Sequence, residues 1–311
     1  MIEEKGDDLF FHSLKVKNII VYLRGNMNNS LLEIDSFKKL HQTLLSDVGI
    51  DLKVCPAGSF LMGNAKLKRF RRDYGSKYIK EKKKWYWHRK RKNFLHKVTL
   101  TKPFMIAKYP VTDAQYESII GNGKIQFRGS LNPDEHSACP IVWKGWDQAV
   151  EFCEKLNVLY ADILPEGYEF NLPTDAQWEY ASKAESGEYK EELSLKKAKL
   201  EQIEIERQSL LKDEFILSPT GYYKPNSWDI CCMNDSVWEW CRDCGHRDFP
   251  KRHVIDPVDV SSDDCRVCRG GFSKNENGYL RKTEWVGECW FNIGFRIALV
   301  PKIVLKYAKG K

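Results

Sequence analysis

The sequence lacks any run of about eighteen consecutive apolar residues, which is the length that a helix needs to cross a lipid bilayer. This absence excludes a membrane-spanning helix. The sequence also lacks the basic and then apolar start of a secretory signal, because its first residues, MIEEKGDDLFF, are acidic. We therefore expect the protein in the cytoplasm.

Net positive charge is lacking from most of the chain, although the net charge of the whole chain is +7. Residues 66–92 hold 14 Lys or Arg against only Asp73 and Glu81, so the remainder of the chain is acidic. Aromatic residues alternate with the cations in this segment, a combination that suits non-specific nucleic-acid binding. A solvated loop that faces the chain's own acidic residues, or one that meets an acidic protein partner, explains the same pattern.

The chain has enough apolar residues to form a hydrophobic core. Hydrophobic residues make up 42% of it and aromatic residues 13%, which argues against global disorder. Ten tryptophans indicate a packed, irregular core. Ten cysteines without an export signal favour buried thiols or metal ligands over disulfides.

The pattern of apolar residues divides the chain near residue 50. We expect residues 1–50 to form an N-terminal extension, with a β-like run followed by a helix whose apolar positions are Leu32, Phe37, Leu40, Leu44 and Leu45.

Residues 51–311 form the main domain, in which Gly and Pro separate short apolar segments typical of strands. Helices are predicted over 113–120 with Thr112 as N-cap, over about 146–159, and from Thr174 onward. The charged residues 185–214 predict an inserted surface helix. A few helices among many short strands indicate an α+β fold.

Seven fragments, in order, resemble the formylglycine-generating enzyme or sulfatase-modifying factor family. They are CPAGSFLMGN, HKVTLTKPFMIAKYPVTDAQY, CPIVWKGWDQAVEFC, FNLPTDAQWEYASKA, SVWEWCRD, RVCRGGF and NIGFRIAL. Together they span about residues 55–299, most of the chain. The resemblance implies a C-type-lectin-like α+β domain with little regular secondary structure.

Most of the matching residues are expected to hold the fold. Tryptophan needs a large apolar pocket and a partner for its N–H, and the two motif arginines are expected to be buried, multiply hydrogen-bonded cations. The paired glycines should allow positive φ or close backbone approach. This structural set comprises Trp178, Trp238, Trp240, Arg269, Gly270, Gly271, Gly294, Phe295 and Arg296.

The resemblance also implies a copper oxidase, but the key residues are missing. Active members of the family carry two cysteines soon after the RGG motif, and paired thiolates suit soft Cu(I). Here those positions fall near Asn275 and Leu280, and Cys289 lies too far along to restore a pair. Copper is therefore not expected. The alternative is a formylglycine-generating-type oxidase that acts on protein cysteine with thiols recruited from Cys265, Cys268 or Cys289.

Two pairs of cysteines have the spacing of a structural zinc site. They are Cys241 with Cys244 and Cys265 with Cys268. A strand running into the RGG motif would point Cys265 and Cys268 to opposite faces, which favours buried free thiols. Both interpretations stay open.

The family's calcium-binding stretch is only partly kept. Hard cations need oxygen ligands, and the sequence retains Asn226 and Glu239. Cys232 and Ser236 stand where the family carries Asp and Asn. One weak calcium site is the most that this pattern predicts.

The interior of the segment 272–292 is rich in aromatic, amide and charged residues. Rigid aromatics with adaptable polar neighbours make good recognition surfaces, and the segment resembles the variable part of retroelement-diversified proteins on this fold. The alternative is that its tryptophans belong to the core. We therefore predict a non-catalytic binding protein for a protein or other macromolecular ligand, with contacts from Lys274, Asn275, Asn277, Tyr279, Lys282, Glu284, Trp285, Glu288, Trp290 and Phe291.

Overall fold

The computed structural model describes residues 27–63, 95–121, 137–184, 220, 225–233, 237–245, 252–260, 264–271, 281–287, 289–290 and 292–303. The β-like run before residue 27, the basic segment 66–92 and the charged segment 185–214 lie outside the described residues. No helix among the described residues is both long and apolar enough to cross a membrane.

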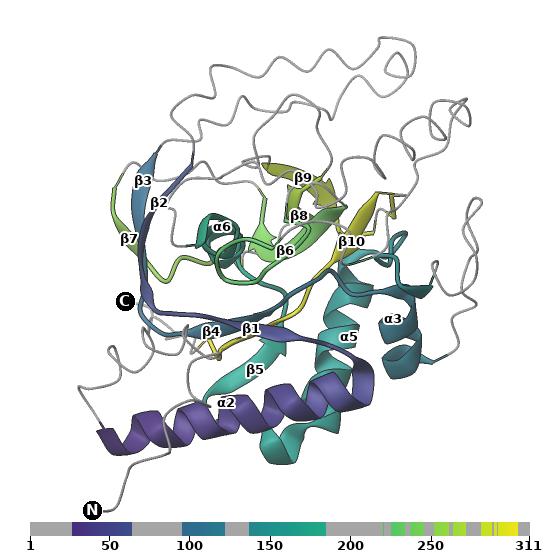
Figure 1. Cartoon of the computed structure of the whole chain (residues 1–311). Coiled ribbons are helices and arrows are strands. Elements are labelled where there is room, and N and C mark those ends of the chain that lie inside the picture. The colour runs from purple at the N-terminus through teal and green to yellow at the C-terminus, as the bar shows by residue number, and fades with distance from the viewer. Residues whose placement is uncertain are drawn as a thin grey trace, which may run out of the picture.

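Three small sheets make up the β part of the described structure (Figure 1). Their orders are β1-β4-β11-β5, β10-β6-β8-β9 and β2-β3-β7. Neighbouring strands run antiparallel except for the pairs β10/β6 and β3/β7. The strands are β1 (Leu52–Cys55), β2 (Gly58–Met62), β3 (His96–Leu100), β4 (Phe104–Ala107), β5 (Tyr168–Asn171), β6 (Trp238–Cys244), β7 (Val254–Ile255), β8 (Cys265–Gly270), β9 (Arg281–Trp285), β10 (Ile293–Phe295) and β11 (Ala298–Pro301).

The predicted helices that fall within the described residues are confirmed, and N-caps explain where α3 and α6 begin. The described helices are α2 (Met27–Val48), α3 (Asp113–Ile120), α5 (Trp146–Leu159), the short η2 (Ala161–Ile163) and α6 (Asp175–Lys183). Thr112 accepts a hydrogen bond from the amide of Gln115, whose side chain accepts one from the amide of Thr112. Thr174 and Gln177 repeat this capping box at α6.

One core lies between α2, α5 and the sheets beside them, and we call it the α5 core. The α2 side chains Phe37, Leu40 and Leu44 are buried in it, and the Phe37 ring meets Tyr168 edge-on at 5.0 Å. Leu45, which the sequence pattern also placed in the apolar stripe, is 46% exposed. Figure 1 shows α2 running below β1, β4 and β5, so the buried face of α2 closes one side of the domain.

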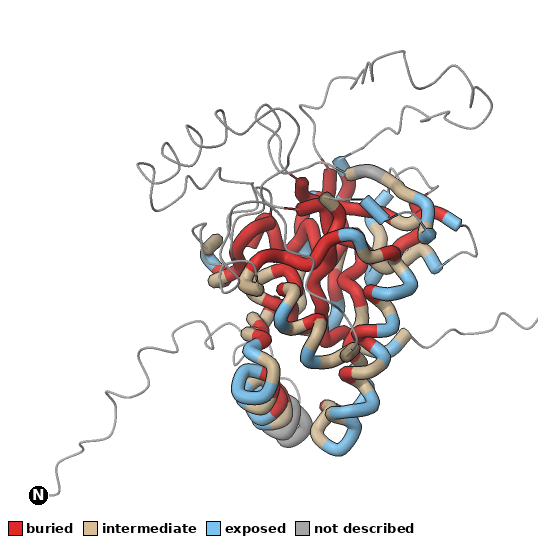
Figure 2. The backbone as a smooth tube through the Cα atoms, turned by 90° about the vertical axis from the view of Figure 1, so that its right-hand side faces the viewer, coloured by how far each residue is buried: buried red, intermediate tan, exposed pale blue. Residues whose placement is uncertain are grey.

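A second core surrounds α6, and we call it the α6 core. Every residue of α6 is buried. Figure 1 shows the reason: the helix lies between the sheet β2-β3-β7 on one side and the strands β6 and β8 on the other. Figure 2 shows the same concentration of buried backbone at the centre of the molecule. The sheet β10-β6-β8-β9 contributes residues to both cores, with Trp240 and Cys268 in the α5 core and Cys241 and Val267 in the α6 core.

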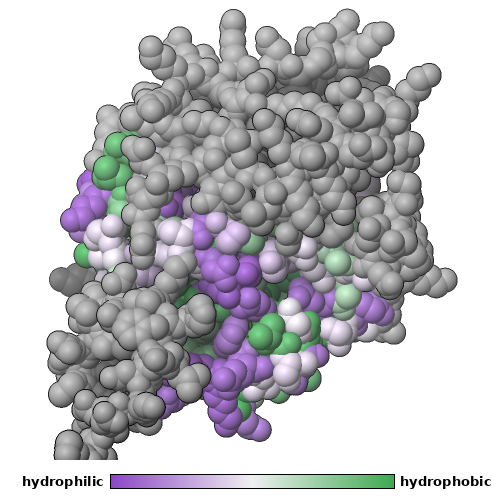
Figure 3. Space-filling view, in the orientation of Figure 1, coloured by the Kyte–Doolittle hydropathy of each residue, from purple (hydrophilic) through white to green (hydrophobic). Residues whose placement is uncertain are grey.

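The mixed fold agrees with the α+β prediction. On the face that Figure 3 shows, hydrophilic side chains form a band through the described part of the surface. Most large apolar side chains of the described residues lie inside the two cores, so the few exposed aromatic residues are informative.

Gly294 on β10 provides a test of this packing. A Cβ at this position would lie 2.3 Å from the carbonyl oxygen of Ile141, which is a backbone atom that cannot move away easily. Overpacking of this kind costs about 1–3 kcal/mol, so Gly294→Ala should lower the Tm by at least about 2 °C. Gly287→Ala is the matched control, since nothing lies within 4 Å of its Cβ. Thermal unfolding measures both, and equal Tm values for the two variants would contradict the close approach.

Candidate functional site

The predicted binding segment is attached to the fold through β9. This strand pairs antiparallel with β8 from Arg281 opposite Arg269 to Trp285 opposite Cys265, and it stands at the end of the sheet order. The RGG motif at the end of β8 and the start of the described binding segment therefore lie side by side. Whatever fixes β8 also fixes the base of this segment.

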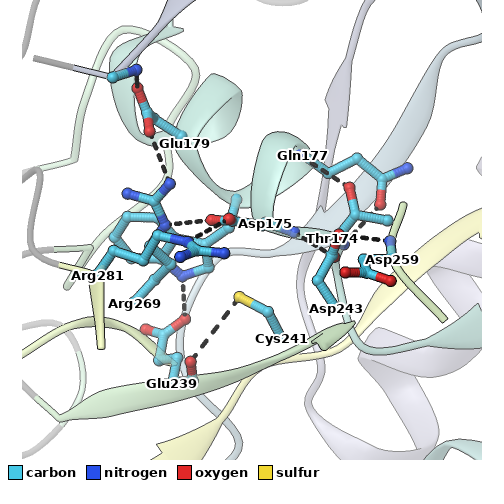
Figure 4. A network of polar contacts seen from close by, with 12 residues as sticks. Thr174, Asp175, Gln177, Glu179, Glu239, Cys241, Asp243, Asp259, Arg269 and Arg281 are labelled. Carbon is cyan, nitrogen blue, oxygen red and sulfur yellow. Dashed lines mark hydrogen bonds and ion pairs between the residues drawn. The ribbon is translucent and has the colours of Figure 1, made fainter. Parts of the chain in front are cut away.

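A buried ion cluster joins β9 to α6 (Figure 4). The Arg281 Nε donates to Asp175 Oδ2 at 2.6 Å, and the Arg269 Nε donates to the other oxygen of the same carboxylate. The Arg281 and Asp175 side chains are only 5% and 6% exposed. Burial alone would raise the pKa of Asp175, but the two guanidinium groups outweigh it and hold this pKa below its usual range.

The same cluster continues along α6. The Arg269 Nη2 donates to Glu179 Oε2 at 2.8 Å, and Glu179 Oε1 meets the Lys183 Nζ at 2.7 Å and accepts from the amide of Gly63 at 2.7 Å. Both Arg269 and Glu179 side chains are 1% exposed. Each described carboxylate oxygen of Asp175 and Glu179 therefore already has a donor from the protein.

A second buried pair, Arg296 with Glu239, ties β6 to the chain before β11. The Arg296 guanidinium binds both oxygens of Glu239, at 2.7 and 2.8 Å, and also donates to the carbonyls of Ala107, Lys108 and Cys231. Trp178 Nε1 donates to Glu239 at 2.7 Å. The prediction that Arg269 and Arg296 are buried, multiply hydrogen-bonded cations is confirmed.

The remaining motif residues also have the packing that the sequence predicts. Gly270 and Gly271 both have φ of +82°, and a Cβ on Gly271 would lie 2.4 Å from the Trp238 ring. Trp240 Nε1 donates to the carbonyl of Lys144 at 2.9 Å, and the Phe295 side chain is fully buried. These residues are buried and build the scaffold.

Asp243 on β6 is the unusual member of the polar network. Burial first, and then the neighbouring Asp175 charge, raises its pKa to about 7. The backbone amides of Asp175 and Asp259 donate to its two oxygens at 2.7 and 3.0 Å. No pattern in the sequence marked this residue, because its environment comes from elements that are distant in the chain.

The indoles of Trp285 and Trp290 face solvent, at 41% and 39% exposure, so the alternative that they belong to the core is wrong. Glu284 is half-buried on β9, and Lys282 lies on the same strand with its side chain outside the described part. The other predicted contacts lie outside the described residues; they are Lys274, Asn275, Asn277, Tyr279, Glu288 and Phe291.

The four cysteines with zinc-like spacing are buried, and none of them forms a disulfide. Cys241 belongs to the α6 core and Cys268 to the α5 core, because strand geometry sends their side chains to different faces of one sheet. No group of three or more His, Cys, Asp or Glu that could hold a metal occurs in the described part of the chain. Sequence spacing therefore does not bring Cys241, Cys244, Cys265 and Cys268 together.

The two residues of the predicted calcium site have structural partners instead. The Asn226 side-chain oxygen accepts from the amides of Trp228 and Ile230, and its nitrogen donates to the carbonyl of Ala181. Glu239 is paired with Arg296. The described residues do not gather an oxygen ligand set around Asn226 and Glu239.

The copper positions of the family lie near Asn275 and Leu280, outside the described residues. An amide and an aliphatic side chain do not fit soft Cu(I), which prefers paired thiolates. Of the thiols that an oxidase could recruit, Cys265 and Cys268 are buried on β8, whereas Cys289 is exposed. The residues present do not fit the family's copper chemistry.

Comparison with known proteins agrees with this geometry. Residues 49–300 match the sulfatase-modifying factor enzyme 1-like domain. Among solved structures, variable protein 1 of Treponema denticola is similar with a TM-score of 0.59 and 20% identity, over 80% of this chain and 95% of that one. PvdO from Pseudomonas aeruginosa is similar with a TM-score of 0.54 and 20% identity, over 80% and 93%. No match was found among the curated proteins.

The raised pKa of Asp243 predicts a pH dependence of stability. A carboxyl whose pKa is about 7 when folded, but near its usual value when unfolded, stabilises the fold at acidic pH, and that contribution is lost as pH rises through about 7. Asparagine imitates the protonated form at every pH. The Tm of Asp243→Asn relative to wild type should therefore increase between about pH 5 and about pH 8, a range that brackets this pKa.

The matched control is Asp162→Asn, which removes one carboxyl group from the exposed turn η2. Thermal unfolding of the three proteins across the pH series measures the effect. The same pH dependence in both variants would show that Asp243 does not titrate as its burial predicts.

Proposed function

Because this chain belongs to the sulfatase-modifying factor enzyme 1-like domain family, we propose a function that its scaffold can perform without copper. The protein is a non-catalytic binding protein that holds a protein or other macromolecular ligand on the segment 272–292. One observation carries this proposal: Trp285 and Trp290 are exposed on a segment whose base is clamped to the core by the buried Arg281.

A clamped base favours binding because it lowers the entropy that association must remove. Each rotamer-rich side chain immobilised at an interface costs about 0.5–1.5 kcal/mol. Arg281 is already fixed by Asp175, and tryptophan offers a large contact area with only two side-chain dihedral angles. The exposed indoles can therefore bind a ligand with a small loss of side-chain entropy.

The polar network supports binding rather than catalysis. A catalytic group needs an atom that can reach substrate, but Asp175, Glu179 and Glu239 direct their oxygens to donors of the protein. The oxidase alternative also requires a thiol pair, and Asn275 and Leu280 stand near the family positions for it.

The likeness to the Treponema denticola structure, which is named a variable protein, is compatible with this proposal. A scaffold whose charges are paired inside the core can tolerate a different sequence on its outer segment, since the network does not depend on the exposed side chains. Here Trp285 and Trp290 are such side chains.

The first test addresses the oxidase alternative. The reduced protein is titrated with Cu(I), and oxygen consumption is followed with a cysteine-containing peptide as substrate. We expect neither stoichiometric copper binding nor turnover above the rate of free Cu(I), because no thiol pair stands at the family positions. Stoichiometric copper with turnover would overturn the proposal. Cys289→Ser then identifies whether the exposed thiol causes any residual copper binding.

The second test addresses binding directly. A random dodecapeptide library on phage is selected on the immobilised protein, and enriched peptides are synthesised and titrated by calorimetry. We expect Trp285→Ala and Trp290→Ala each to weaken binding at least about tenfold, since buried indoles at interfaces contribute 2 kcal/mol or more, roughly. Leu61→Ala, on the 52% exposed Leu61 of β2, is the matched control. Peptides that bind all four proteins equally would contradict the placement of the site.

A further inference from the structure

A third exposed indole, Trp143, lies outside the segment that the sequence singled out. It is 43% exposed, and its φ is 60° although it is not glycine. A bulky residue in this left-handed region is strained by about 1–3 kcal/mol. The fold therefore holds a large apolar side chain in an unfavourable backbone conformation at a position that is partly exposed to solvent.

The backbone around Trp143 lies directly against the loop that carries the other two indoles. The amide of Trp143 donates to the carbonyl of Trp290 at 3.2 Å, and the amide of Trp146 donates to the carbonyl of Val286 at 3.1 Å. A Cβ on Gly145 would lie 3.0 Å from the Val286 oxygen, so the two segments are in close contact. The backbone at Trp143 therefore lies next to that of Trp290 and close to Val286, which follows Trp285 in the chain. We call the three exposed residues Trp143, Trp285 and Trp290 the indole surface.

Two basic side chains next to the indole surface lie over aromatic rings of the protein itself. The Lys144 Nζ lies 4.6 Å from the centre of the Tyr116 ring. The Arg266 guanidinium lies 4.4 Å from the centre of the Trp146 ring. Both cations are therefore engaged by the fold, and neither residue is fully exposed.

The acidic side chains at the same place are more open to solvent. Asp147 follows Trp146 and is exposed, and Asp264, whose carbonyl accepts from the amide of Val286 at 2.8 Å, is exposed too. Glu284 precedes Trp285 on β9 and is half-buried. Two exposed carboxylates, those of Asp147 and Asp264, therefore lie next to the indole surface, where Lys144 and Arg266 are half-buried.

Exposed indoles beside carboxylates form a surface that suits a cationic partner. A guanidinium or ammonium group gains about 0.5–2 kcal/mol over an indole face, and carboxylates at the rim steer positive charge toward it. We propose that the indole surface binds an arginine- or lysine-rich peptide segment, with Trp143 as a contact residue. This inference rests on the proposed binding function and adds to it the ligand class and a residue distant in the sequence.

The test uses two synthetic peptides of equal length, one alternating glycine with arginine and the other alternating glycine with glutamate. Calorimetry and tryptophan fluorescence follow their binding to the full chain. We expect the arginine peptide to bind and the glutamate peptide not to bind. Trp143→Ala should weaken binding about threefold to thirtyfold, and Trp143→Phe should lose less because it keeps an aromatic face. Raising the salt concentration should weaken the binding further.

The carboxylates are tested with a charge-matched control. Asp147→Asn and Asp264→Asn should each weaken binding of the arginine peptide at least about twofold. Asp35→Asn on α2 removes the same charge from an exposed site elsewhere, with its side chain 77% exposed, and should leave the affinity unchanged. Equal losses in all three variants would show a general charge effect and overturn the proposal. Circular dichroism confirms that each variant is folded.

The outcomes separate this inference from the proposed function. If library peptides depend on Trp285 and Trp290 but the arginine peptide does not bind, the cationic ligand class is wrong and the binding function stands. If maltoheptaose binds and the arginine peptide does not, the surface takes carbohydrate and the inference is again overturned. If no peptide or sugar depends on the indoles, both proposals fail.

Discussion

The structure depends on one buried carboxylate, that of Asp175, which two arginines share. Burying a single arginine or carboxylate without a partner costs several kcal/mol, roughly, so Arg269 and Arg281 can lie inside only because Asp175 starts α6 at this point. Removal of any one of the three would leave an unpaired charge in the interior. The helix α6, the strand β8 with the RGG motif and the strand β9 are therefore stabilised together. The fold and the base of the outer segment form one unit, and the position of β9 is not adjustable independently of the core.

This coupling explains how the scaffold can separate stability from recognition. The charged groups that distinguish the family's motifs point inward and bind each other: Arg269 with Asp175 and Glu179, and Arg296 with Glu239. The groups that face water in the same region are indoles and carboxylates, which contribute little to the interior. A change in the outer side chains leaves the network intact. Asp243 differs from the three paired acids Asp175, Glu179 and Glu239. Burial and the neighbouring Asp175 charge raise its pKa to about 7, so its ionised form is not stabilised as theirs is.

Residues with local or motif signatures were predictable from the sequence, and residues that depend on distant partners were not. Thr112 and Thr174 predict the starts of their helices from the sequence, because a capping box is complete within about four residues. Gly270, Gly271 and Arg296 follow from the resemblance. Arg281 was not identified, since one arginine in a polar stretch has no signature until Asp175 is seen opposite it. The cysteine spacing suggested zinc because spacing records distance along the chain, whereas the two faces of a strand decide that Cys241 and Cys268 lie in different cores.

Trp143 is likewise a residue whose surroundings depend on a part of the chain that is distant in the sequence. Its position just before α5 gives no sign that it lies beside Trp290, and only the hydrogen bond between their backbones shows it. A left-handed conformation at a partly exposed tryptophan lowers the stability of the isolated chain. A ligand that covers the indole surface would bury Trp143 with Trp285 and Trp290 and offset that strain. The same contact would place positive charge next to the exposed Asp147 and Asp264, while the half-buried Lys144 and Arg266 lie over aromatic rings of the protein. Strain, exposure and charge are thus three independent observations, and one cationic ligand accounts for all of them.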